Sequence, residues 1–281
     1  MSGFDAGWLG LREDADTAAR ASVLERVLKT ALPAREPLSV VDLAAGTGSN
    51  LRHLAPRFGG TQMWRLVDAD PALLDAVAER LRAQGWTVNT ENEVIAQCNA
   101  ADVRITRNTA DLAREAIPAD ADLVTASALL DLVSREWLDR LAAACAARGV
   151  PVLLTLSVDG TLVWEPAAET DATVRDLVVR HQRTDKGFGP ALGPDAPDAA
   201  AAAFANHGYS VETAASPWRL GPSDVRLQQH LHAGWAAAAT ETAPTHEAAI
   251  SDWLAHRMDL LAAGVGTVTV RHQDVLALPP S

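Results

Sequence analysis

The chain has few of the residues from which metal and disulfide sites are built. Its 281 residues include only two cysteines, Cys98 and Cys145, which lack the CxxC spacing of a zinc site or redox pair. Histidine and carboxylate residues also lack the clustered spacing of metal ligands. We therefore expect no metal ion, and we expect both cysteines to be reduced and structural, as in a cytoplasmic protein.

Lysines and long hydrophobic runs are also scarce. Two lysines stand among 24 basic residues, against 36 acidic residues, which gives a net charge of −12. Binding of nucleic-acid phosphates needs clustered Lys and Arg, so no nucleic-acid partner is expected. The longest apolar run, residues 150–158, is too short to cross a bilayer. The N-terminal MSGFDAG lacks the basic and apolar regions of a signal peptide, so we expect neither a membrane partner nor a leader.

Hydrophobic residues, by contrast, make up 48% of the chain, which is enough for a large core. The most informative stretch is SVVDLAAGTGSNL, residues 39–51. Val40, Val41 and Leu43 have the apolar character of a strand buried on both faces. Gly46 and Gly48 then allow a tight turn beside a ligand, and helical spacing follows. The free N–H groups at the start of that helix suit a polar or anionic ligand group.

A second strand and helix follow in WRLVDADPALL, residues 64–74. The strand ends at Asp68, and Asp70 with Pro71 begins the next helix as a capping residue and a first-turn proline. Asp68 lies 20 residues after Gly48. An acidic side chain at this place accepts hydrogen bonds from both hydroxyls of a ribose.

Two ligand classes use this arrangement. A dinucleotide fingerprint requires a third small residue where the helix packs on the strand, but Leu51 occupies that place, which disfavours a nicotinamide oxidoreductase. The glycine turn instead resembles that of class I (Rossmann-like) S-adenosylmethionine-dependent methyltransferases, in which an acidic residue precedes GxGxG. Asp42 matches the acidic residue. Gly46 and Gly48 match the second and third glycines, and Ala44 replaces the first.

The resemblance implies an α/β fold with a Rossmann-like doubly wound sheet of seven strands, mostly parallel, with an antiparallel final strand and helical insertions. We expect a single methyltransferase domain over residues 1–281, with an N-terminal helix at 5–32 that covers the cofactor. Residues 86–100 are expected to be mostly loop. The insertions at 160–194 and 218–263 would form a cap and determine acceptor specificity. Beyond the first two strands, we expect strands at residues 102–106, 122–127, 150–158, 209–213 and 267–275.

The resemblance also implies which residues hold S-adenosyl-L-methionine. Asp68, with Ala69 beside it, would hold the ribose. Asn108, after the third strand, would accept a hydrogen bond from the adenine amino group, with Asp111 as the alternative. Ser127 ends the fourth strand, where ligands bind in an open α/β sheet.

The N-terminal helix offers two candidates for the cofactor carboxylate. Either Arg12 or Arg20 would reach it by resemblance to the family, in which an N-terminal helix often covers the cofactor. The alternative interpretation is a surface helix with solvated arginines.

Methyl transfer requires a dry pocket in which the acceptor approaches the methyl group from behind. The fourth strand is followed by SALL rather than the Asp/Asn-Pro-Pro-aromatic motif of planar-amine methylation, so adenine and glutamine amides are not expected as acceptors. His181 and Asp185 are candidate bases, although His181 also suits a polar position near a loop. Candidate substrate-binding residues, for several of which core, capping or surface roles are alternatives, are Trp8, Asp131, Lys186, Phe188 and Trp218.

The sequence therefore predicts transfer of a methyl group from S-adenosylmethionine to a small-molecule acceptor, by a monomer or homodimer. The alternative is a Rossmann-like binding protein that holds the cofactor or its product without catalysis.

Overall fold

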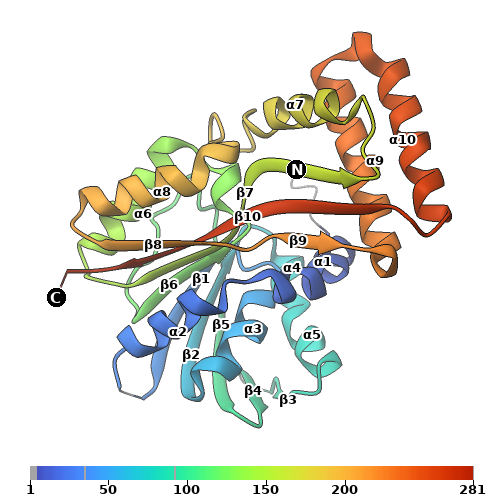
Figure 1. The fold of residues 1–281 in the computed structure, drawn as a ribbon. Coiled ribbons are helices and arrows are strands. Elements are labelled where there is room, and N and C mark those ends of the chain that lie inside the picture. Colours follow the sequence, from blue (N-terminus) through green and yellow to red (C-terminus); the bar gives the residue numbers. More distant parts are fainter. Residues whose placement is uncertain (1–4, 35, 92, 281) are drawn as a thin grey trace.

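The computed structural model describes residues 5–34, 36–91 and 93–280; residues 1–4, in which no leader is expected, lie outside the described part with 35, 92 and 281. A ten-stranded sheet runs through the molecule in the order β3-β4-β5-β2-β1-β6-β7-β10-β8, and β9 pairs with β10 beside this path (Figure 1). No helix of the described residues is long and apolar enough to cross a membrane.

Seven of these strands form the predicted Rossmann-like sheet, which is thereby confirmed. Five neighbouring strands are parallel, and β10 is inserted antiparallel between β7 and β8. The strands are β5 (Ala101–Thr109), β2 (Gly60–Asp68), β1 (Leu38–Leu43), β6 (Leu123–Ser127), β7 (Val152–Glu165), β10 (Thr267–Leu278) and β8 (Ser210–Ala215).

Helices cover both faces of the sheet, which explains why its central strands are almost uniformly apolar. On β1, Val40 packs with one set of helices and Val41 with the opposite set. The first set contains α2 (Ser22–Ala31), α3 (Ser49–Phe58), α4 (Pro71–Asp75) and α5 (Val77–Ala83); the second contains α6 (Arg135–Ala146), α8 (Ala196–Asn206) and the short helices η1 (Leu130–Leu132) and η2 (Gly193–Asp195).

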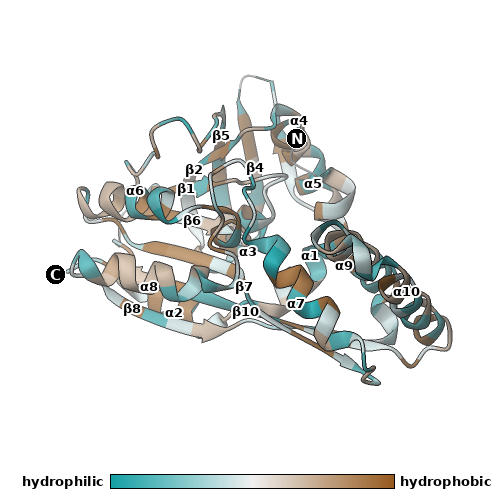
Figure 2. Ribbon diagram, turned by 90° about the horizontal axis from the view of Figure 1, so that it is seen from above, coloured by the Kyte–Doolittle hydropathy of each residue, from teal (hydrophilic) through white to brown (hydrophobic). Residues whose placement is uncertain are grey.

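A third cluster of buried side chains lies beyond one end of the sheet. There the ends of β7 and β10 and strand β9 (Trp218–Leu220) pack with the cap helices, which we define as α7 (Asp171–Gln182), α9 (Val225–Thr242) and α10 (Glu247–Ala262) (Figure 1). The short helices η3 (Pro222–Asp224) and η4 (Pro244–His246) precede α9 and α10. In Figure 2 the cap helices show both teal and brown residues, as expected for helices with one buried face.

The N-terminal segment is two helices rather than the single expected helix at residues 5–32. Helix α1 (Ala6–Ala19) ends at Arg20, whose backbone leaves the helical region at φ −52°, ψ 140°. The next amide, of Ala21, donates to the buried Asp274 carboxylate of β10 at 2.9 Å. A contact between residues so far apart in the sequence sets this break, and helical periodicity alone does not reveal it.

Two further expectations about secondary structure were wrong. Residues 86–100 contain the antiparallel strands β3 (Thr87–Asn89) and β4 (Val94–Cys98) rather than mostly loop. In β4 the buried Val94 and Ala96 alternate with exposed neighbours, which is the pattern of a strand with one solvated face. The insertion at 160–194 begins inside a strand, because β7 continues to Glu165 by pairing with β10.

Candidate active site

The turn between β1 and α3 lies where the carboxyl ends of the parallel strands meet. The register places Leu43 of β1 opposite Val67 of β2 and Ala126 of β6, so the residues that follow these strands share one edge. Gly46 and Gly48 adopt positive φ angles of 53° and 80°, as the sequence predicts for a tight turn.

Ala44, which replaces the first glycine of the family pattern, also has a positive φ of 52°. The two other described non-glycine residues with positive φ are Ala128, just after β6, and Leu156 within β7. Left-handed backbone is costly for residues with a Cβ atom and gathers at ligand sites. Strain in three neighbouring strands or their ends therefore points to this edge of the sheet as the functional site.

Asp68 holds the glycine turn against the end of β2. Its Oδ2 accepts the Gly46 N–H at 2.8 Å, and its Oδ1 accepts the Asp70 N–H at 2.9 Å. Burial raises the pKa of Asp68, and the two backbone hydrogen bonds oppose that rise. Each carboxylate oxygen has a second lone-pair direction, so both remain able to accept from a ligand hydroxyl. Ala69 follows Asp68 with an exposed side chain.

A buried polar network lies beneath the glycine turn. Asn50, in the first turn of α3, donates to Asp42 Oδ1 and to the Thr125 hydroxyl, both at 3.0 Å. Arg20 donates to Asn50 Oδ1 at 2.6 Å, to the Thr155 hydroxyl at 3.2 Å and to the Ser127 hydroxyl at 3.3 Å. The network thus joins the α1–α2 break to the ends of β1 and β6 and to Thr155 of β7.

Two charged groups of this network are not fully satisfied. Asp42 is completely buried, its Oδ2 has no hydrogen-bond partner, and burial raises its pKa to about 7. Arg20 is 7% exposed and its Nε is also unpartnered; burial lowers its pKa. A buried polar atom without a partner costs free energy, which a ligand that supplies the missing hydrogen bonds would recover.

Arg20, rather than Arg12, is the arginine that reaches the network. Arg12 instead forms a bidentate ion pair with Asp16, at 2.9 and 3.1 Å, and lies over the ring of Trp218 at 4.9 Å. The sequence named both arginines without distinguishing them, because the break after α1 decides which one turns inward.

Helix α1 lies against the glycine turn. A Cβ atom added to Gly46 would lie 2.9 Å from the Leu9 Cδ1 atom. On the same helix, Trp8 and Arg12 line a cavity of about 140 Å³ between the sheet edge and the cap. Residues of α1 thus contact the glycine turn and also line this cavity.

We call this space the cap cavity. Its floor comes from the strained positions Ala128 and Leu156 and from Asp131 of η1. Its walls are largely apolar and aromatic and include residues from β7, β9, β10, α7 and α9. Trp8, Asp131 and Trp218, three of the predicted acceptor residues, line it together with residues that the sequence did not single out, among them Gln182, Trp235 and His272.

The candidate bases and the two other predicted acceptor residues are not among the residues that line the cap cavity. Asp185 accepts the Gly187 and Gly189 N–H groups at 2.7 and 3.0 Å, which shapes its own loop. Lys186 donates to the Thr184 hydroxyl at 2.9 Å, and His181 Nε2 lies 3.3 Å from Glu241. Phe188 packs edge-on against Trp137, with ring centroids 5.7 Å apart. The catalytic roles of His181 and Asp185 stay predictions.

Asn108, the adenine candidate, lies within β5 rather than after it, because β5 extends to Thr109. It is exposed and pairs with Val67 of β2. Asp111 accepts the Ala113 N–H at 3.0 Å, which is the turn-capping role that the sequence left open for it. Leu51, which excludes the dinucleotide pattern, is fully buried between α3 and the sheet.

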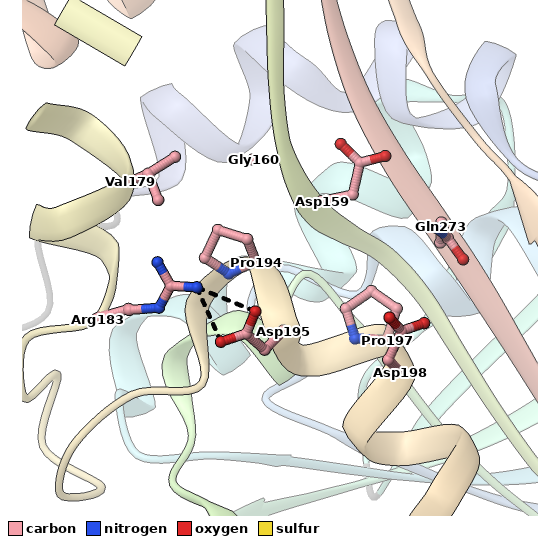
Figure 3. A pocket seen from close by; sticks show the side chains of 9 residues that line it. All are labelled: Asp159, Gly160, Val179, Arg183, Pro194, Asp195, Pro197, Asp198 and Gln273. Atoms are coloured by element: carbon pink, nitrogen blue, oxygen red, sulfur yellow. Dashed lines mark hydrogen bonds and ion pairs between the residues drawn. The ribbon is translucent and has the colours of Figure 1, made fainter. Parts of the chain in front are cut away.

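A second hollow, of about 360 Å³, adjoins the cap cavity and shares Gly160 and Val179 with it. Figure 3 shows Arg183, which directly follows α7, bound to Asp195, while Asp159 of β7 and Gln273 of β10 also line the hollow. Asp198 also lines this hollow. No group of three or more His, Cys, Asp or Glu among the described residues is placed to hold a metal ion.

Comparisons with known proteins find likeness at the level of structure alone. No family model matches the sequence, and no curated protein does. A methyltransferase from Thiobacillus denitrificans in complex with S-adenosylhomocysteine is 16% identical, with 99% of each chain covered and a TM-score of 0.45. Bacillus subtilis YcgJ is 13% identical, with 93% of this chain and 100% of that chain covered and a TM-score of 0.49.

A third similar structure is Haemonchus contortus phosphoethanolamine N-methyltransferase 2, at 14% identity and a TM-score of 0.47. The match covers 97% of this chain but only 57% of that protein. Because these identities and TM-scores are low, we assign the fold from the order of the strands in the sheet. The order β5-β2-β1-β6-β7-β10-β8, with β10 antiparallel, and the glycine turn after β1 give the chain the class I, Rossmann-like fold of S-adenosylmethionine-dependent methyltransferases.

Proposed function

We propose that the protein binds S-adenosyl-L-methionine at the glycine turn and transfers its methyl group to a small molecule in the cap cavity. The observation that carries this proposal is the pair of buried polar atoms without hydrogen-bond partners beside the turn, Asp42 Oδ2 and Arg20 Nε. The methionine part of the cofactor has an ammonium and a carboxylate. It therefore offers a donor for Asp42 Oδ2 and an acceptor for Arg20 Nε.

The remaining cofactor contacts follow from the same edge of the sheet. Asp68 accepts the ribose hydroxyls with the lone pairs that Gly46 and Asp70 leave free. The Asn108 side-chain oxygen accepts from the adenine amino group. Ser127, already within 3.3 Å of Arg20, helps to hold that arginine in place. Ala44 carries a Cβ atom where the family has glycine. This atom narrows the space for the methionine part of the cofactor.

When bound, the cofactor supplies an electrophilic methyl group, which the acceptor's lone pair takes as the carbon–sulfur bond breaks and its electrons stay on sulfur. The chain's own contribution is positioning and exclusion of water. Helix α1 separates the glycine turn from bulk solvent, and the cap closes the opposite side of the cavity. An acceptor in the cap cavity would thus lie beside the cofactor rather than across the protein from it.

Incubation with methyl-labelled cofactor and a small-molecule extract tests this function. We expect label to appear in a low-molecular-mass product, and we expect S-adenosylhomocysteine to inhibit its formation. A protein that binds both cofactor forms equally and yields no labelled product would instead be a binding protein without catalysis. Failure to bind either form would overturn the proposal itself.

A further inference from the structure

The cap cavity contains a carboxylate that no protein cation neutralises by direct contact. Asp131 lies in η1 at the cavity floor, and among the described residues the only recorded donor to its carboxylate is its own backbone amide. Arg12 acts on it electrostatically but is held by Asp16 in a two-pronged ion pair. The cavity therefore has an anion whose partner is still to be supplied.

Two further polar atoms in the cavity wall are also without partners. Gln182 Oε1 and His272 Nδ1 are buried and make no hydrogen bond within the described structure. His272 is only 3% exposed, and burial lowers its pKa to about 3 although backbone contacts at Ser216 and Val270 oppose the shift, so its ring is neutral near pH 7. Buried polar groups without partners cost free energy, which a ligand with several hydrogen-bond donors would recover.

The remainder of the wall sets the size and character of the ligand. Trp8, Trp218 and Trp235 line a space of about 140 Å³. A cavity of about 150 Å³ holds a benzene molecule, so the buried part of the ligand is close to one aromatic ring in size. Aromatic walls also attract cations through the faces of their rings.

The adjoining hollow favours approach by a cation. Its two nearby arginines are already paired, Arg183 with Asp195 at 2.8 Å and Arg271 with Asp159 at 3.2 Å. Asp198 is an additional carboxylate there and forms no ion pair with the described residues. A cleft with excess charge of one sign raises the local concentration of ligands of the opposite sign.

We infer that the cap cavity binds the protonated amine of a small molecule with an apolar, ring-sized body, through Asp131. This inference rests on the proposed function, because it names the class of molecule that the methyltransferase would hold. The protonated nitrogen has no lone pair, so it anchors the molecule to Asp131 and could take a methyl group only after losing its proton. A neutral alcohol of the same shape lacks the charge that Asp131 requires, and a carboxylate is repelled by it.

Binding can be tested without knowing the natural acceptor. The tryptophans of the cavity report on occupancy, so we would titrate benzylamine, benzyl alcohol and benzoate into the protein saturated with S-adenosylhomocysteine and follow tryptophan fluorescence. We expect benzylamine to bind about tenfold more tightly than benzyl alcohol or better, and benzoate most weakly, as for a charge-assisted hydrogen bond. Equal affinities, a preference for benzoate, or no saturable response to benzylamine would overturn the inference.

Asp131→Asn should remove the preference for the amine while retaining the shape of the side chain. Asp252→Asn, an exposed change on α10 outside the cavity, is the matched control and should preserve the preference. Retention of the amine preference in Asp131→Asn would contradict the inference. Binding of S-adenosylhomocysteine by the same variant separates this result from a failure of the proposed function, since the cofactor site does not include Asp131.

The unaltered protein provides a second test. Burial raises the pKa of Asp131 to about 6, so benzylamine affinity should fall as pH decreases from 8 to 5 and Asp131 becomes protonated, whereas benzyl alcohol affinity should stay constant. Constant benzylamine affinity over this range would contradict the assignment to Asp131. The charged or titratable groups around Asp131 and the two cavities are Arg12 with Asp16, His272, Arg271 with Asp159, Arg183 with Asp195, and Asp198.

Discussion

Replacement of Arg20 by methionine tests how the proposed cofactor is held. Arg20 makes three hydrogen bonds to neutral oxygens, and no carboxylate of the described residues lies within ion-pair distance of it. Asp16, Asp274, Glu25 and Asp42 act on it only through longer-range attraction. The guanidinium is thus poised for an anionic group, and Nε has no other partner.

The size of the effect follows from the bond that the variant removes. A hydrogen bond between charged groups contributes about 1.5 to 3 kcal/mol, which corresponds to a change of about 10- to 150-fold in affinity. S-adenosylhomocysteine has the amino-acid carboxylate, whereas 5′-methylthioadenosine shares its adenosine part but lacks that group. We therefore expect the unaltered protein to prefer S-adenosylhomocysteine, and Arg20→Met to lose most of that preference.

Calorimetric titration of both ligands into both proteins measures this difference directly. Arg26→Met is a suitable control, because Arg26 is an exposed arginine on the adjacent helix α2. Circular dichroism would establish that each variant is folded. If Arg20→Met keeps the full preference, Arg20 does not bind the carboxylate. If Arg12→Met loses the preference instead, then Arg12 of α1 binds the carboxylate.

Two further predictions concern the acidic residues of the turn. Asp68→Asn should weaken S-adenosylhomocysteine and 5′-methylthioadenosine equally, by about 10- to 150-fold, because both contain the ribose; calorimetry that finds unequal losses would argue against a ribose contact. Burial raises the pKa of Asp42 from 3.8 to about 7, so the folded protein holds this proton more tightly than the unfolded chain and loses stability as pH rises between these values. Asp42→Asn should remove that contribution, about 4 kcal/mol at most, from the difference in urea unfolding free energy between pH 4 and pH 8; an unchanged difference would refute the burial argument.

The sheet and the glycine turn were predictable because their signals are local. Apolar runs such as Val40 to Leu43 and the glycines that follow them fix strand and turn without reference to distant residues. Asp68 was predictable for the same reason, since its distance from Gly48 is set along one strand–helix–strand unit.

Which side chains lie at the glycine turn and in the cap cavity depends instead on contacts between segments that are distant in the sequence. Arg20 turns inward because the chain breaks after α1, and that break is fixed by Asp274 of β10. His272 lines the cap cavity because β10 continues past the sheet edge alongside β7, which lengthens into the cap. A polar residue facing the core within the final strand was the available signal for both His272 and Asp274.

The loop at residues 183–194 contains the candidate base Asp185 and two predicted acceptor residues, Lys186 and Phe188. Asp185 and Thr184 take part in local hydrogen bonds that shape this loop. Phe188 packs toward Trp137 rather than the cap cavity. The directions of these side chains depend on local turns and on neighbouring helices, which the sequence pattern does not reveal.

The central claim is that the glycine turn binds the cofactor, and calorimetry with S-adenosylhomocysteine tests it most directly. Gly46→Ala adds a Cβ atom 2.9 Å from Leu9 at a residue with φ +53°, whereas Gly85→Ala imposes a similar backbone strain at φ +81° with no atom within 4 Å. We predict saturable binding of one molecule per chain in the unaltered protein and in Gly85→Ala, and at least about tenfold weaker binding in Gly46→Ala. No binding by the unaltered protein, or equal binding by Gly46→Ala, would contradict the account.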